Sequence, residues 1–271
     1  MQKNQYGMPL LGLGTFGRTG PEGVEAILAA LEIGYRHLDT AQTYHTEGEC
    51  GLALRRSGLR RDEVFVTTKI STDNFGPGAL LPSLRQSLDQ LQLDQVDLTL
   101  IHWPSPRGKV AMPVYIEQIA EAQALGLSKT IGVSNFPIAL LEEAQAILGD
   151  IKLVNNQFEC HPYLQNHKLV NYCRNNDISV TCYLPIARGA LAGDPALEPL
   201  ARQKDCSVEQ LALAYAMARG LAVIPASGRR DRLASNFAAA AITLDAADMA
   251  ILASVDRGQR YIDFDWAPAW D

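Results

Sequence analysis

Short runs of β-branched and other apolar residues alternate with helical patterns along the whole 271-residue chain. Successive runs end 23 to 42 residues apart, which leaves room for a helical crossover to a parallel strand. About eight such units close into a barrel, and domains of this kind have roughly 250 residues. We therefore predict a single domain over residues 1–271, an eight-stranded parallel β/α barrel of the TIM type. Its strands are expected to end near Thr15, Asp39, Lys69, His102, Ser134, Gln157, Tyr183 and Pro225.

Helical signals fill the intervals between the expected strands. Residues 21–34 carry apolar side chains at helical spacing, with Pro at the start and Gly at the end. Residues 207–210 form a capping box that opens a helix over 211–218. The widest interval, between Tyr183 and Pro225, predicts an extra helical segment after the seventh strand, near residues 197–203. The tail after Asp256 is expected to pack across one end of the barrel.

Composition argues against several classes of protein. Apolar residues make up 47% and charged residues 20% of the chain, as in ordinary globular domains. A net charge of -6 disfavours non-specific binding to nucleic acid or to anionic membranes. The five cysteines contain no C-x-x-C pair, and the histidines lack H-x-H or H-E-x-x-H spacing, so no disulfide framework or metal site is expected.

No apolar run approaches the ~18 residues of a membrane helix, and residues 1–7 do not resemble a signal peptide. We expect a cytoplasmic monomer that binds neither nucleic acid nor membrane.

Four polar residues gather around three of the predicted strand ends. Asp39, Lys69 and His102 close strands, and Tyr44 lies one short loop beyond Asp39. The C-terminal ends of parallel barrel strands converge on one face, so these side chains can meet there. A phenol with a pKa near ~10 is a slow acid alone, and a neighbouring ammonium lowers that pKa. Asp39 can pair with Lys69, and His102 can donate a hydrogen bond to a carbonyl oxygen. The set suggests protonation of an oxygen whose carbon is attacked by hydride.

Spacing alone leaves other interpretations open. An Asp–Lys pair beneath a Tyr can be a satisfied structural network, and a histidine after an apolar run can be a core residue. A barrel glycosidase is disfavoured, because it would need paired carboxylates at suitable strand ends, and strands end here in His102 and Tyr183.

Six short motifs narrow the choice, and they span nearly the whole chain. They are Leu38-Asp39-Thr40-Ala41-Gln42-Thr43-Tyr44, Thr67-Thr68-Lys69, Leu100-Ile101-His102-Trp103-Pro104, Ile131-Gly132-Val133-Ser134-Asn135-Phe136, Asn156-Gln157-Phe158-Glu159 and Val223-Ile224-Pro225. In this order they resemble the aldo-keto reductase family. The resemblance implies an NAD(P)H-dependent enzyme in which Tyr44 is the general acid, Lys69 and Asp39 tune it, and His102 orients the substrate carbonyl.

The resemblance also implies where the cofactor lies. Ser134, Asn135, Gln157 and Tyr183 are implied to position the nicotinamide. No G-x-G-x-x-G motif stands in a βαβ context, so a Rossmann site is unsupported. Further cofactor contacts are expected from Gly14, Thr15, Asp39 and Leu184.

The other end of the cofactor is expected after the last strand, where barrels commonly bind phosphate beside a helix N-terminus. Residues 227–232 are rich in donors and positive charge, and Ser227, Arg232 and Asn236 are the expected contacts. These residues could instead be a solvent-exposed run of charges. Cations at a helix N-terminus are unfavourable beside the positive end of the helix dipole, however, so a bound anion explains their presence better. The family often has Lys where this chain has Ala226, which removes one partner for a 2′-phosphate. We expect NADPH as the cofactor, with NADH less favoured.

The substrate is expected to be a small carbonyl compound. Phe16, Ser71 and Trp103 are the predicted pocket residues, and Ser71, where close relatives tend to carry Trp, predicts a wider or more polar pocket. The resemblance points to bacterial reductases of keto sugar acids, such as 2,5-diketo-D-gluconate, and of small α-oxoaldehydes, such as methylglyoxal. An alternative is a non-catalytic NADP(H)-sensing binding subunit built on the same barrel.

Overall fold

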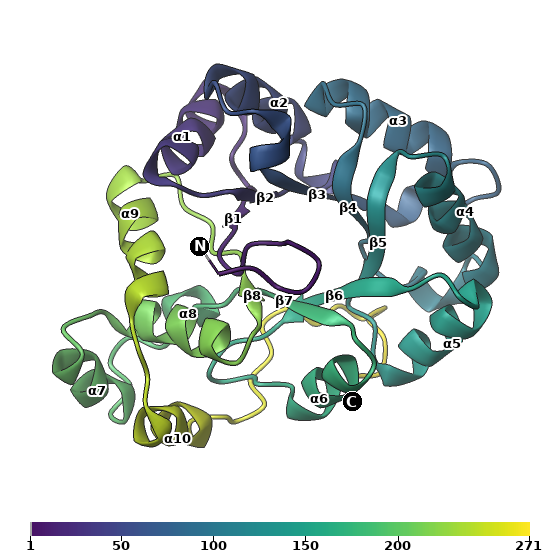
Figure 1. Cartoon of the computed structure of the whole chain (residues 1–271). Coiled ribbons are helices and arrows are strands. Elements are labelled where there is room, and N and C mark those ends of the chain that lie inside the picture. Colours follow the sequence, from purple (N-terminus) through teal and green to yellow (C-terminus); the bar gives the residue numbers. More distant parts are fainter. Residues whose placement is uncertain (1) are drawn as a thin grey trace.

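Eight parallel strands follow one another in sequence order around the molecule, with the helices outside them (Figure 1). The computed structural model describes residues 2–271. The strands are β1 (Leu13–Gly14), β2 (His37–Asp39), β3 (Phe65–Ile70), β4 (Val96–Ile101), β5 (Ser128–Ser134), β6 (Leu153–Glu159), β7 (Ser179–Tyr183) and β8 (Ala222–Val223). Leu11 pairs in parallel with Val223, and the backbone N–H of Gly12 donates to the Val223 carbonyl at 2.9 Å. The sheet therefore closes between its first and last strands, as the sequence predicts.

The expected strand ends are close to the observed ones. Asp39, Ser134 and Tyr183 are the last residues of their strands. Lys69 is the penultimate residue of β3 and His102 directly follows β4, whereas Gln157 lies two residues inside the end of β6. All of these positions face the same end of the barrel because every strand runs in the same direction.

Ten α-helices lie in the part of the chain that the structure describes. They are α1 (Gly20–Ile33), α2 (Glu47–Arg56), α3 (Leu80–Leu91), α4 (Met112–Ala124), α5 (Ile138–Leu148), α6 (His167–Asn175), α7 (Leu197–Gln203), α8 (Val208–Ala218), α9 (Arg230–Ala238) and α10 (Ala246–Ser254). The extra segment predicted in the widest interval is α7. The predicted capping box opens α8, since the Ser207 side chain accepts from the Gln210 N–H and the Gln210 side chain accepts from the Ser207 N–H.

Two chain ends cover the two ends of the barrel. An N-terminal hairpin, in which Lys3 pairs with Pro9, lies across the end that faces the viewer in Figure 1. The C-terminal tail, residues 257–271, lies on the opposite side and ends beside α5. Among residues 2–271, no helix combines the length and the apolar character that crossing a membrane requires.

Gly132 marks a tight contact in the barrel wall and provides a test of the packing. An ideal Cβ at this residue of β5 would lie 2.5 Å from the Asn155 carbonyl oxygen of β6. We expect Gly132→Ala to lower the free energy of unfolding by about 1–3 kcal/mol, because the obstructing atom belongs to backbone. Thermal unfolding measured by circular dichroism checks this.

Gly48→Ala is the matched control, because a Cβ at this position of α2 would meet nothing within 4 Å. It should leave stability unchanged or raise it by about 0.5–1 kcal/mol. Equal melting temperatures for the two variants would contradict the tight contact between β5 and β6.

Candidate active site

The predicted polar residues meet at the C-terminal ends of the strands. Asp39 ends β2, Lys69 comes from β3 and His102 follows β4. Tyr44 ends a short 3₁₀ turn, Gln42–Tyr44, which follows β2 and is closed by His45 in the left-handed conformation (φ 54°). This turn folds Tyr44 back over the strand end, so that a residue outside the barrel wall reaches the ammonium group of Lys69.

The Lys69 ammonium is completely buried, and its donors are used. It forms an ion pair with Asp39 Oδ1, donates to the Thr40 carbonyl at 2.9 Å and lies 3.5 Å from the Tyr44 hydroxyl oxygen. The second carboxylate oxygen, Asp39 Oδ2, accepts from Gln157 Nε2 at 2.7 Å. Buried charges are tolerated when they are paired and hydrogen-bonded in this way. The sequence prediction that Asp39 pairs with Lys69 is confirmed.

The pKa of Tyr44 differs from the sequence expectation. Burial raises it, and the Lys69 ammonium, which lowers it, offsets only part of that effect. Burial likewise disfavours the ammonium of Lys69, but Asp39 and Tyr44 outweigh burial and raise the pKa of Lys69. The phenol is therefore protonated and the amine charged at neutral pH. In this state Tyr44 can give up a proton beside a fixed positive charge.

His102 lies beside Tyr44 and is neutral. Burial, with a smaller contribution from Lys69, lowers the pKa of His102 to about 3. The two rings meet edge to face, with centroids 5.4 Å apart. The Thr43 hydroxyl lies 3.3 Å from His102 Nδ1. When Thr43 donates this hydrogen bond, Nε2 carries the imidazole proton and can serve as a donor to a ligand.

A cavity of about 490 Å³ opens over these residues, within the usual size of small-molecule sites. It is lined by Gly14, Phe16, Asp39, Thr43, Tyr44, His102, Trp103, Ser134, Asn135, Gln157, Tyr183, Leu184, Pro185, Ile186, Arg188, Ile224, Pro225, Ala226, Ile262 and Phe264. Polar groups thus gather on its floor, whereas aromatic and aliphatic side chains form much of its wall.

One wall of the cavity is a row of amides and hydroxyls at the ends of β5, β6 and β7. The Tyr183 hydroxyl donates to Asn135 Oδ1 at 2.8 Å, and Asn135 Nδ2 donates to the His102 carbonyl at 3.1 Å. Asn135 has φ 64°, a left-handed conformation that Asn tolerates better than most residues. Gln157 donates to Asp39, and its Oε1 has no protein partner within residues 2–271. That oxygen can accept a hydrogen bond from a ligand amide.

The structure does not bring every predicted site residue to this cavity. Thr15 is buried behind it, where its hydroxyl contacts the Asp39 carbonyl and the Thr46 hydroxyl, both at 3.0 Å. Ser227, Arg232 and Asn236 lie in and before α9, outside the cavity lining. Ser71, predicted as a pocket residue, is also not among the residues that line this cavity. Its hydroxyl caps the next 3₁₀ turn by accepting from the Asp73 N–H, so the side chain folds onto its own loop.

Sequence reasoning missed several lining residues. Pro185, Ile186 and Arg188 come from the loop after β7, and Ile262 comes from the tail. The width of the interval after Tyr183 did indicate a ligand-facing loop. The loop contains left-handed conformations at Leu184, Ala187 and Arg188, none of which is a glycine, as well as at Gly189.

The tail is fixed over the cavity by a buried carboxylate. Glu159, at the end of β6, accepts from the backbone N–H groups of Tyr261 at 2.7 Å and of Ile262 at 2.8 Å. Trp103 then packs edge-on against Phe264, Trp266 and Trp270, with centroids 5.5, 5.2 and 6.1 Å away. The expectation that the tail packs across a barrel end is confirmed, and the tail supplies part of the cavity wall.

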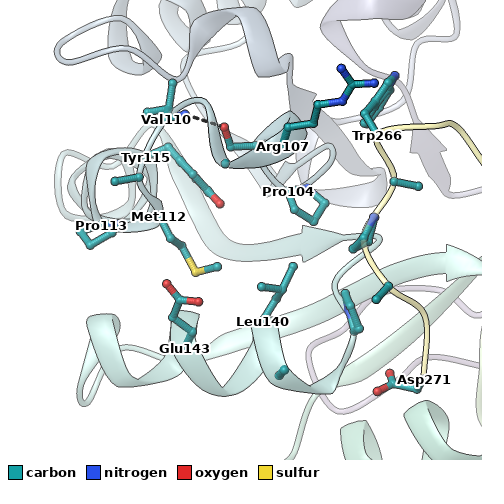
Figure 2. Close-up of a pocket in the computed structure, with 18 of the residues that line it drawn as sticks. Pro104, Arg107, Val110, Met112, Pro113, Tyr115, Leu140, Glu143, Trp266 and Asp271 are labelled. Carbon is teal, nitrogen blue, oxygen red and sulfur yellow. Dashed lines mark hydrogen bonds between the residues drawn. The ribbon is translucent and has the colours of Figure 1, made fainter.

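A second cavity, of about 670 Å³, lies between the loop after β4, the starts of α4 and α5, and the tail (Figure 2). Two of its three carboxylates are engaged: Arg107 pairs with Asp265 at 2.7 Å, and the Asp271 carboxylate accepts from the Ile138 N–H at 3.0 Å. It contains none of Asp39, Tyr44, Lys69 or His102. The cavity over the strand ends is therefore the candidate active site.

Comparisons with known proteins agree with this geometry. A model of the Aldo/keto reductase family matches residues 10–257. The chain belongs to the aldo/keto reductase family. It is 42% identical over 265 residues to methylglyoxal reductase DkgB of Yersinia pestis, covering 97% of this chain and 99% of that relative. It is 34% identical over 291 residues to an NADP-dependent D-sorbitol-6-phosphate dehydrogenase of Malus domestica, covering 94% and 93%.

A solved structure gives the same result for the fold. It is named provisionally as a 2,5-diketo-D-gluconic acid reductase B and superimposes with a TM-score of 0.94, at 35% identity, over 99% of this chain and 95% of that one. The protein is therefore an oxidoreductase that acts on carbonyl groups, with small-molecule carbonyl substrates and a nicotinamide cofactor. Among residues 2–271, no group of three or more His, Cys, Asp or Glu side chains is arranged to hold a metal ion.

The low pKa of His102 can be measured directly. We expect its imidazole ¹⁵N shifts to stay constant between about pH 5 and pH 8, because the ring is neutral throughout. A His102→Gln variant assigns the signals. A midpoint near ~6.5, the value of a free side chain, would contradict the geometry. Because the folded-state pKa is the lower one, His102 should also reduce stability as the pH falls from about 6.5 toward about 3.

Proposed function

We propose that the protein reduces aldehydes and ketones to alcohols with NADPH, and that Tyr44 is the general acid. The observation that carries the proposal is the Tyr44 hydroxyl, which lies 3.5 Å from the buried Lys69 ammonium and belongs to the lining of the cavity that also contains His102. A protonated phenol beside a fixed cation is suited to donating its proton to an oxygen that gains negative charge, because the ammonium then stabilises the phenolate.

Each residue has a distinct part in this proposal. Tyr44 Oη donates the proton to the carbonyl oxygen, and Asp39 keeps Lys69 charged and in place. His102 Nε2 donates a second hydrogen bond to the same oxygen and so orients the carbonyl. Trp103 and Phe264 are large apolar groups of the wall, which limit the water that reaches the reacting atoms. When bound, the reduced nicotinamide supplies hydride to the carbonyl carbon.

The cavity fits a nicotinamide. Gln157 Oε1, Ser134 and Asn135 offer acceptors and donors for a carboxamide, and the Tyr183 ring offers a face against which the pyridine can stack. Gly14, Asp39 and Leu184 also line this region. Beyond the cavity, Ser227, Arg232 and Asn236 on and before α9 would hold the phosphate-bearing end. NADPH is favoured over NADH because Arg232 is an exposed cation at this end, and one relative is named as NADP-dependent.

The proposed substrates are small and polar. The names of the relatives point to methylglyoxal and to 2,5-diketo-D-gluconate. Phe16, which is 68% exposed, lies at the mouth and packs edge-on against Tyr44, with ring centroids 5.2 Å apart. Arg188 is a cation in the lining and suits substrates that carry a carboxylate.

Removal of one hydroxyl tests the proposed acid. We expect Tyr44→Phe to lower the kcat for methylglyoxal reduction by about 10²–10⁴-fold, because the proton donor is lost while the aromatic ring stays. NADPH binding should persist. The readouts are NADPH oxidation in the presence of substrate and NADPH binding by calorimetry.

Tyr172→Phe is the matched control, because it removes a phenol hydroxyl from α6, whose residues do not line the cavity. It should keep full activity. Undiminished turnover in Tyr44→Phe would refute the role of Tyr44. A wild-type protein that binds NADPH but reduces neither methylglyoxal nor 2,5-diketo-D-gluconate would favour the non-catalytic, cofactor-sensing alternative.

A further inference from the structure

The side chain of Arg18, from the loop after β1, rests on the turn that leads into α9. Its Nη1 lies only 2.4 Å from the position that a Cβ at Gly228 would occupy. In this position the guanidinium occupies the space that a side chain at residue 228 would take. The Arg18 backbone N–H donates to the Thr15 carbonyl at 2.9 Å, and the Arg18 carbonyl packs closely against Gly23 near the start of α1.

This guanidinium has no hydrogen-bond or ion-pair partner within residues 2–271. Its Nε atom is buried and makes no hydrogen bond, and no ion pair to Arg18 occurs within residues 2–271. Buried donors are nearly always satisfied by protein, water or a ligand. An ordered cation with an unused buried donor is the signature expected of a group that binds an anion.

The neighbouring arginines are already neutralised. Arg229 forms an ion pair with Asp231, and Arg230 pairs with Glu32 of α1 at 2.7 Å. The remaining cation of the turn, Arg232, is exposed. Much of the positive charge seen in the sequence of this turn is thus cancelled locally, and Arg18, from the other end of the chain, replaces part of it.

The position of Arg18 relates it to the active-site cavity. Phe16, two residues before Arg18, and Ala226, two residues before Gly228, both line that cavity. A molecule that leaves the cavity between them passes along the face on which the guanidinium lies. The N-cap residue of α9 makes no side-chain cap, and the Asp231 carboxylate in the first turn interacts with the backbone N–H groups of Asp231 and Arg232.

We propose that Arg18 binds a phosphate group of the dinucleotide, in place of the cation that Ala226 does not provide. This inference rests on the proposed NADPH-dependent function. A guanidinium offers a planar pair of donors that matches phosphate oxygens, and Arg232 is a second, exposed cation that follows the same turn. The phosphate is either the 2′-phosphate or the pyrophosphate, and the two differ in whether NADH is affected.

The test is binding of NADPH and of NADH to the full chain, measured by calorimetry without substrate. We expect Arg18→Met to weaken NADPH binding by about tenfold to a hundredfold, the loss of one charge-assisted contact. A loss confined to NADPH identifies the 2′-phosphate, and an equal loss for NADH identifies the pyrophosphate. Arg18→Lys should recover part of the affinity because it restores the charge without the fork.

Arg56→Met is the control for net charge. It removes one arginine from α2, where Arg56 pairs with Glu25 at 2.7 Å, and it should bind both dinucleotides like wild type. Unchanged affinity of Arg18→Met for both dinucleotides, with tight binding by wild type, would overturn the role of Arg18 alone. If wild type binds neither dinucleotide, the proposed function fails and the role of Arg18 fails with it.

Discussion

The buried ion pair between Asp39 and Lys69 is the interaction on which the rest of the site depends. An unpaired charge at this depth would cost several kcal/mol, so the closed barrel is stable only with both members of the pair present. It joins β2 to β3, which lie side by side with Asp39 opposite Thr67. Gln157 of β6 then reaches across to the second oxygen of the carboxylate. The ammonium group therefore has a fixed position, and Tyr44 needs only to be folded onto it by a short turn.

A second buried carboxylate, that of Glu159, fixes the cavity wall and does not contact the proposed catalytic residues. Glu159, the last residue of β6, accepts from backbone N–H groups of the tail and thereby sets the height of Ile262 and Phe264 above the cavity. Two residues apart on one strand, Gln157 supports the reacting groups and Glu159 supports the wall that a substrate meets. Different side chains therefore support the reacting groups and the part of the wall that a substrate meets. The tail can vary in sequence without disturbing the catalytic end of the barrel.

The fold and the convergence of the four polar residues could be predicted because both follow from periodicity and strand direction. The extra helix after β7 and the capping box of α8 were equally local signals. The direction of the Tyr44 pKa shift could not be predicted, since it depends on how deeply the folded chain buries the phenol. Ser71 was expected in the pocket because close relatives tend to carry Trp there, and the resemblance could not show that its hydroxyl bonds to its own turn. Arg188 could not be found from the sequence because three left-handed non-glycine residues direct its loop.

The ion pairs around the turn before α9 could not be predicted from the sequence. A net charge of -6 suggests a protein that repels anionic ligands, and the arginines after β8 suggest a local exception. Neither the net charge nor the number of arginines takes account of the ion pairs that form in the folded protein. Asp231 and Glu32 neutralise two of those arginines, while Arg18, more than 200 residues earlier in the chain, stands unpaired beside the same turn. The positive charge available to a ligand therefore comes from the arginines that lack a carboxylate partner. Arg18 reaches this turn because the barrel closes between β1 and β8.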